Sequence, residues 1–215
     1  MRILIFGDSI THGFFDKEGG WAVRLVNQYH WDSYENRDKN GRWVESFNLG
    51  ISGDKAGGVL KRFDAEVAAR QIYPETNVIV IAIGTNDSWI TDDKPVNDPH
   101  HYAEEISELI AKAKLITDRV LFVGMPSVDD KMCNDGWQYS SEKPATSNDR
   151  IWEFEQALRT TCAKQNVPLV KIFETFKARD EQQSLLSDGL HPNDAGHALI
   201  ADLVKPEIEK LLQDS

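Results

Sequence analysis

Three residues near the two ends of the chain have the types that nucleophilic catalysis requires. Ser9 follows a short apolar run at the start, and Asp188 and His191 lie three positions apart near the end. A serine hydroxyl is a weak nucleophile until a neighbouring base accepts its proton, and neutral imidazole is suited to that role near pH 7. A carboxylate can orient the imidazole and stabilise its protonated form. We therefore predict Ser9 as nucleophile, His191 as base and Asp188 as the residue that orients it.

Other small and polar residues are suited to stabilising an oxyanion, the negative charge that develops on oxygen during acyl transfer. Such an intermediate needs hydrogen-bond donors that are already in place. The backbone N–H groups of Ser9 and Gly53 and the side-chain amide of Asn86 are candidate donors. Glycine at position 53 allows the backbone to approach the reacting centre closely.

Strand and helix patterns alternate along the chain. Short apolar runs predict five strands, at residues 2–6, 43–49, 77–83, 120–123 and 167–173. Apolar residues at helical spacing predict helices between and after them, at 20–35, around 59–67, from 98–99 onward, at 148–164 and from 193 onward. We expect Pro206 to bend or break the last helix. This alternation indicates one α/β domain, residues 1–215, with a five-stranded parallel sheet and helices on both faces.

The candidate residues all follow predicted strands. Segments 7–11, 48–54 and 84–87 come directly after the first three strands, and 188–192 follows the fifth after a short link. In open α/β sheets, ligands bind outside the carboxyl ends of the strands. The sequence therefore predicts that these four segments converge on one crevice.

The same four segments resemble the motifs of a known family. Gly7-Asp8-Ser9-Ile10 resembles the GDSL motif, and Gly53, Gly84-Thr85-Asn86-Asp87 and Asp188-Gly189-Leu190-His191-Pro192 follow in the order typical of SGNH/GDSL hydrolases. The resemblance implies a three-layer, flavodoxin-like α/β/α sandwich and metal-independent ester hydrolysis without a cofactor. It also implies a triad of Ser9, Asp188 and His191, with Ser9, Gly53 and Asn86 as oxyanion donors.

Composition limits the class of partner. The formal net charge of −11 disfavours nucleic acids and anionic membrane surfaces, which bind through Lys and Arg. No secretory signal is recognisable, and no apolar run approaches the roughly 18 residues of a membrane span. We expect a cytoplasmic protein acting on a small-molecule ester, without stable membrane association. Cys133 and Cys162 are in no metal-binding or redox pattern, so we expect free thiols.

Several residues have structural alternatives. Ser9 is also a plausible helix cap, and Asp188 and Asn193 compete to cap the last helix. We expect a structural role for Asp8, and His12 is a candidate for lining the pocket. The long connections 88–97 and 126–147 are either functional or solvated surface loops. Trp89 and Trp137 lie on them as candidate pocket walls.

Four functions remain open at this point. The leading hypothesis is hydrolysis of small carboxylic esters. Deacetylation of a carbohydrate, and lysophospholipase or thioesterase action on longer chains, are alternatives within the same family. A non-catalytic binding module is the alternative outside enzymes. Neither a GxSxG elbow nor a nucleotide-binding glycine motif is present.

Overall fold

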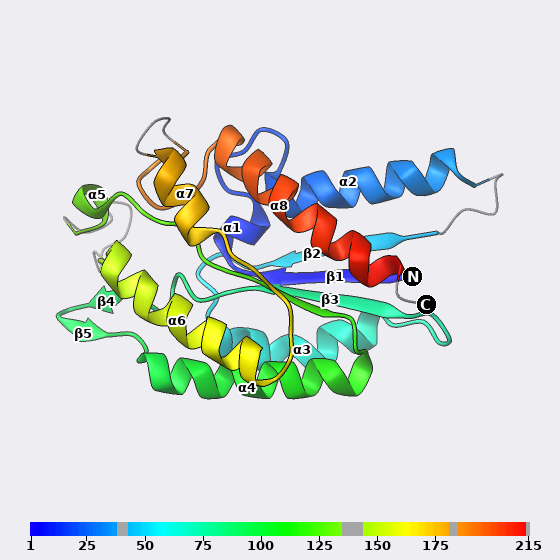
Figure 1. Cartoon of the computed structure of the whole chain (residues 1–215), viewed down its shortest axis with the longest axis horizontal. Helices are drawn as coiled ribbons and strands as arrows, with labels where there is room; N and C mark the ends of the chain where they lie inside the picture. The colour runs from blue at the N-terminus through cyan, green and yellow to red at the C-terminus, as the bar shows by residue number, and fades with distance from the viewer. Residues whose placement is uncertain (38–42, 135–143, 181–184, 214–215) are drawn as a thin grey trace.

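Five parallel strands form a central sheet with helices on both faces (Figure 1). A computed structural model of the chain describes residues 1–37, 43–134, 144–180 and 185–213. Across the sheet the strands are β2 (Glu45–Gly50), β1 (Arg2–Gly7), β3 (Asn77–Ala82), β6 (Val120–Val123) and β7 (Leu169–Val170). A small antiparallel pair, β4 (Ile90–Thr91) and β5 (Lys94–Pro95), lies in the connection after β3. The predicted α/β class and five-stranded parallel sheet are confirmed.

Helices cover the sheet in two groups, which Figure 1 shows above and below it. The upper group contains α2 (Gly20–Glu35) and α8 (Asp194–Gln213), and the lower contains α3 (Ala56–Arg70), α4 (Pro99–Ile116) and α6 (Asn148–Lys164). Three short helices are α1 (Ser9–His12), α5 (Asp130–Asn134) and α7 (Phe173–Asp180). Side chains alternate along β1: Ile3 and Ile5 pack toward α2 and α8, whereas Leu4 and Phe6 pack toward α3 and α4.

The predicted elements match where apolar periodicity is strong. Helices 20–35 and 148–164 and strand 120–123 have the bounds expected from the sequence. The predicted fifth strand, 167–173, is reduced to β7, because the chain turns into α7 at Phe173. Of the bend or break expected at Pro206, the break does not occur, because α8 continues through this residue. The buried side chains of Val204 and Ile208 hold the helix against the sheet on both sides of the proline.

The end of β1 leads directly into α1. Asp8 caps this helix by accepting a hydrogen bond from the Ile10 N–H at 2.9 Å. Gly7 allows the turn, since a Cβ there would lie 2.1 Å from Thr11 Oγ1. Ser9 is therefore the first residue of α1 and not its cap, and it sits at the carboxyl edge of the sheet.

Two further features concern the chain as a whole. Cys133 and Cys162 are buried and form no disulfide, as expected. Within the described ranges, no helix combines the length and apolar character needed to cross a bilayer.

Candidate active site

Ser9, His191 and Asp188 are linked by an unbroken chain of hydrogen bonds. Ser9 Oγ lies 2.9 Å from His191 Nε2, and His191 Nδ1 lies 2.8 Å from Asp188 Oδ2. Ser9 and His191 are both buried. With Asp188 accepting at Nδ1, the Nδ1–H tautomer leaves Nε2 free of hydrogen and able to accept a proton from Ser9. The structure thus brings together the three residues predicted from opposite ends of the chain.

A tight turn fixes the Asp188 carboxylate beside the imidazole. Asp188 Oδ1 accepts backbone hydrogen bonds from His191 at 2.7 Å and Leu190 at 3.1 Å, while Oδ2 faces the ring. Burial would raise the pKa of Asp188, but the hydrogen bonds from the His191 side chain and backbone outweigh it and lower the pKa below its ordinary value. Asn193 caps α8 instead, accepting from Ala195 and Gly196. Because Asn193 caps α8, the Asp188 carboxylate is not needed as its cap and contacts His191 instead.

Asp8 has a structural contact but an unusual environment. Its side chain is 3% exposed and caps α1. Burial raises the pKa of Asp8 from 3.8 to about 7, against the lowering effects of the Ile10 N–H and the nearby His191. The expected structural role agrees with this geometry, because the Asp8 side chain caps α1.

The Asn86 and Gly53 segments are joined by a hydrogen bond. Asn86 Nδ2 donates to the backbone carbonyl of Asp54, the residue after Gly53, at 2.9 Å. Gly53 has a φ of +76°, and a Cβ at this position would meet no atom within 4 Å. The glycine is therefore required by its backbone conformation and faces open space. Arg62 holds the same turn by donating to the Asp54 carboxylate at 2.9 Å.

The turn after β3 is anchored by its own carboxylate. Asp87 is fully buried and accepts hydrogen bonds from the Ala56 N–H at 3.2 Å and Asn97 Nδ2 at 3.0 Å. Burial raises the pKa of Asp87 to about 6, and the hydrogen bond from Asn97 opposes that rise. Asp87 thus fixes the segment carrying Asn86 relative to the start of α3.

Two aromatic side chains beside His191 were not singled out from the sequence. The rings of Phe14 and Phe15 meet the His191 imidazole in tilted, edge-on contacts, with centroid separations of 5.8 and 5.4 Å. His12, a candidate pocket residue, contacts Phe14 with centroids 5.3 Å apart. Two exposed phenylalanines in a row are a weak signal in a sequence, because only the fold puts them against a histidine 170 or more positions away.

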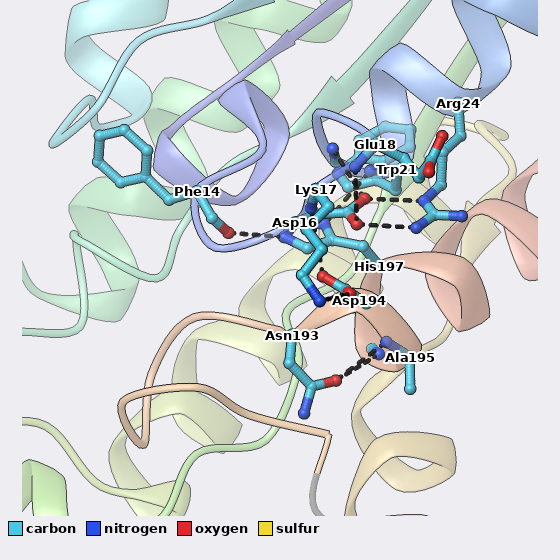
Figure 2. A network of polar contacts seen from close by, with 12 residues as sticks. Phe14, Asp16, Lys17, Glu18, Trp21, Arg24, Asn193, Asp194, Ala195 and His197 are labelled. Carbon is cyan, nitrogen blue, oxygen red and sulfur yellow. Dashed lines mark hydrogen bonds and ion pairs between the residues drawn. The ribbon is translucent and has the colours of Figure 1, made fainter.

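A network of polar contacts, most of them partly buried, holds the segment 13–19 that carries these rings (Figure 2). His197 Nε2 lies 3.0 Å from the Phe14 carbonyl oxygen, and His197 Nδ1 accepts from the Trp21 N–H at 3.2 Å. The Asp16 carboxylate receives two hydrogen bonds of 2.7 Å from Arg24 and one of 2.9 Å from the Gly20 N–H. No sequence pattern predicts this network, because its acceptors include a backbone carbonyl.

The long connections lie together where they are described. Ser88 Oγ is 2.8 Å from Thr146 Oγ1, and Ile90 and Ala145 exchange backbone hydrogen bonds. Trp89 packs against the core between the sheet and the lower helices. Trp137, the other candidate pocket wall, lies outside the described residues. In the described part of the chain, no three His, Cys, Asp or Glu side chains are grouped to hold a metal ion.

Comparison with known proteins identifies the family. A model of the GDSL-like lipase/acylhydrolase family matches residues 5–199. The chain belongs to this family. As a family member it is a carboxylic ester hydrolase, and the residues that carry the GDSL resemblance fall inside the matched range.

Relatives of this hydrolase include esterases that span almost its whole length. An isoamyl acetate-hydrolyzing esterase of Saccharomyces cerevisiae is 25% identical, covering 97% of this chain and 86% of that protein. An isoamyl acetate-hydrolyzing esterase 1 homolog of Homo sapiens is 23% identical, covering 97% and 82%.

Solved structures share its fold. A lipase/acylhydrolase from Enterococcus faecalis has a TM-score of 0.71 at 23% identity, covering 97% of this chain and 95% of that one. An acetylxylan esterase from Geobacillus stearothermophilus has a TM-score of 0.72 at 19% identity, covering 96% and 93%.

Proposed function

We propose that the protein hydrolyses small carboxylic esters through an acyl-enzyme on Ser9. The observation that carries this proposal is the chain of hydrogen bonds from Ser9 Oγ through His191 to Asp188, with distances of 2.9 and 2.8 Å. These contacts have the reach required for proton transfer between a nucleophile, its base and an orienting carboxylate.

In the first half-reaction, Ser9 Oγ attacks the ester carbonyl carbon while its proton moves to His191 Nε2. The resulting tetrahedral intermediate collapses when the bond to the alcohol oxygen breaks and the same proton passes from Nε2 to that oxygen. In the second half-reaction, water attacks the acyl carbon and gives a proton to Nε2. The proton returns to Ser9 as the carboxylic acid leaves, so the enzyme ends unchanged.

The oxyanion is stabilised by the backbone N–H groups of Ser9 and Gly53 and by the Asn86 amide. A side-chain amide has two N–H donors, and the bond to the Asp54 carbonyl uses one of them. That bond also fixes the orientation of Asn86, which makes its second donor preorganised. The open space beside Gly53 supports access of a substrate oxygen to this turn.

The substrate class that we favour is an ester with a short acyl group. Two relatives are named for the hydrolysis of isoamyl acetate, which is an ester of acetic acid.

The proposal is tested by Ser9→Ala, with Ser107→Ala on α4 as the matched control. Loss of the nucleophile removes several orders of magnitude in rate, so we expect no measurable hydrolysis of p-nitrophenyl acetate and no labelling by a fluorophosphonate probe. Ser107 contacts Gln165 on the lower face of the sheet. We therefore expect Ser107→Ala to hydrolyse p-nitrophenyl acetate and to be labelled by the probe as the wild type is. Substantial turnover by folded Ser9→Ala protein contradicts the mechanism.

A further inference from the structure

Phe14 and Phe15 are exposed aromatic residues at the reacting centre, and the proposed mechanism gives them no task. Phe14 is 37% exposed and Phe15 is 53% exposed, whereas His191, which both rings contact, is 2% exposed. Each ring contacts the imidazole, and both residues still expose part of their surface to solvent. Exposed apolar surface next to a reactive group is typical of a surface that binds a ligand.

The backbone at Phe15 is held in a conformation that bulky residues rarely adopt. Its φ of +65° lies in the left-handed region, which is unfavourable for a side chain with a Cβ. Such strain persists only where the surroundings enforce it, and it concentrates at functional sites. Here His197 contacts the Phe14 carbonyl oxygen, and the Asp16 carboxylate accepts a hydrogen bond from the Gly20 N–H; Figure 2 shows both side chains. These contacts therefore hold the backbone that carries the Phe14 and Phe15 rings in one conformation.

The chemistry of acyl transfer decides which part of an ester lies beside these rings. The carbonyl oxygen must point to the Gly53 and Asn86 donors, whereas the alcohol oxygen must come within about 3 Å of His191 Nε2 to receive its proton. The carbon atoms attached to the alcohol oxygen then lie next to the imidazole, where Phe14 and Phe15 offer apolar surface.

We propose that Phe14 and Phe15 form the binding surface for the alcohol part of the ester, so that the enzyme selects esters of apolar alcohols over esters of polar alcohols such as sugars. This rests on the proposed function and deepens it. Apolar carbons gain affinity by leaving water for the aromatic surface, whereas sugar hydroxyl groups would lose hydrogen bonds to water there without a partner on the rings.

The test uses acetate esters, which share the acyl group and differ only in the alcohol. We expect kcat/KM of the wild type to be about tenfold higher for 3-methylbutyl acetate than for methyl acetate, after correction for hydroxide-catalysed rates. Each fully buried methylene contributes about fourfold, and half-exposed rings bury only part of the chain. A monoacetylated sugar is expected to fall below methyl acetate.

The double variant Phe14→Ala/Phe15→Ala is expected to bring the ratio of 3-methylbutyl to methyl acetate to within about twofold of one. Phe15→Leu, which keeps apolar surface, retains part of the preference and guards against a folding defect in the double variant. Trp31→Ala is the matched control, because Trp31 is an exposed aromatic residue on α2 whose ring contacts Tyr34 and not His191. It keeps the wild-type ratio.

Three results would overturn the proposal. In the first, the folded double variant keeps the wild-type ratio of kcat/KM for 3-methylbutyl acetate to that for methyl acetate. In the second, the variants leave this ratio intact and change the preference among methyl esters of different acids. In the third, they reduce kcat/KM equally for every ester, which would mean that the rings only support His191. Failure of the proposed function has a different signature, since the wild type then hydrolyses none of these esters and Ser9 is not labelled.

Discussion

Ser9 and His191 lie 182 positions apart in the chain, yet their side chains are within hydrogen-bonding distance. Local contacts position each of them. Ser9 is placed by the cap that Asp8 supplies to α1, and His191 by the turn that Asp188 closes. Because both supports are short-range, the alignment of hydroxyl and imidazole follows once the strand ends are brought together.

Asn86→Ala tests the donor role of this amide. The oxyanion exists only in the transition state and the intermediate, so its loss is expected to lower kcat by about 100- to 1000-fold with little change in KM. Steady-state kinetics with p-nitrophenyl acetate measures the split. Thermal unfolding of the variant checks that the turn held by the Asp54 carbonyl is still formed. An effect restricted to KM assigns Asn86 to substrate binding instead.

Asp8→Asn tests the cost of burying a carboxylate. The folded-state pKa of about 7 lies above the unfolded value of 3.8, so the folded protein holds a proton that the unfolded chain releases between these pH values. Stability from this group is present below pH 4 and is lost as pH rises to 7. Asparagine keeps the oxygen that caps α1 and does not ionise. We expect the variant to be more stable than the wild type at pH 8, by up to about 4 kcal/mol.

Urea unfolding of both proteins at pH 5, 6 and 8 measures this difference, which should widen with pH. Asp16→Asn is a matched control of opposite sign. Although burial raises the pKa of Asp16, hydrogen bonds from Arg24 and the backbone lower it to about 2. Removing that carboxylate is expected to destabilise the protein at pH 8. An Asp8→Asn advantage that does not vary with pH refutes the ionisation argument.

At the scale of elements, α8 is coupled to the segment between α1 and α2. His197 in the first turns of α8 contacts Phe14 and Trp21, and Asp194 pairs with Lys17 at 3.3 Å. The same helix follows directly after the turn that carries His191. The two sides of the site, imidazole and phenylalanine rings, are therefore supported from one helix.

His197→Phe tests that coupling. The variant removes a hydrogen bond at each end of a fully buried ring and leaves the Phe14 carbonyl and Trp21 N–H without their partner, so we expect a loss of about 2–4 kcal/mol in the free energy of unfolding. His197→Gln can still donate to the carbonyl and is expected to lose less. Chemical denaturation compares the three proteins, and equal stability of all three contradicts the role.

The same histidine gives a pH signature. Burial lowers the pKa of His197 below its ordinary value of 6.5, against the raising effect of the hydrogen bond to Phe14. Its contribution to stability is complete above pH 6.5 and is lost as pH falls from there toward the folded-state pKa, because the unfolded chain binds the proton first. His197→Gln has no such titrating group, so the difference in free energy of unfolding between the wild type and the variant becomes smaller at lower pH.

In the whole molecule, Ser9 begins α1 at the carboxyl end of β1, while Asp188 and His191 lie between α7 and α8. Figure 1 shows these elements at the end of the sheet where its parallel strands finish. The sheet itself is packed with apolar side chains on both faces, which leaves the substrate to bind over the edge. We therefore expect kcat/KM to be higher for acetyl and butyryl esters than for palmitoyl esters. Extra methylenes add affinity only where the protein buries them.

A series of monomeric p-nitrophenyl esters below their aggregation limits measures this preference. Because the alcohol is constant, the series reports the acyl side alone and is independent of Phe14 and Phe15. A kcat/KM that rises up to twelve carbons or beyond would favour lysophospholipase or thioesterase action over hydrolysis of small esters.

Apolar periodicity in the sequence predicted the order of the main strands and helices and the polar segments that follow the strands. Buried strands such as Asn77–Ala82 and amphipathic helices such as Gly20–Glu35 have strong periodicity, because one face of each must leave water. The rule that parallel strands end at one edge then predicted that Ser9, Asp188 and His191 meet. Short elements escaped this reasoning: α7 has eight residues and little apolar periodicity, so only its packing through the fully buried Phe176 reveals it.

The aromatic and buried polar surroundings of the site are visible only in the folded chain. The contacts of Phe14 and Phe15 with His191, and of His197 with a backbone carbonyl, join segments more than 170 positions apart. No local sequence pattern predicts these contacts. Every residue has a backbone carbonyl, so nothing in the sequence marks the one that His197 contacts. An exposed phenylalanine outside a periodic apolar pattern likewise gives no sign of which residue it will contact. Burial likewise sets the raised pKa of Asp8, since the cost of its charge depends on atoms that the fold places around it.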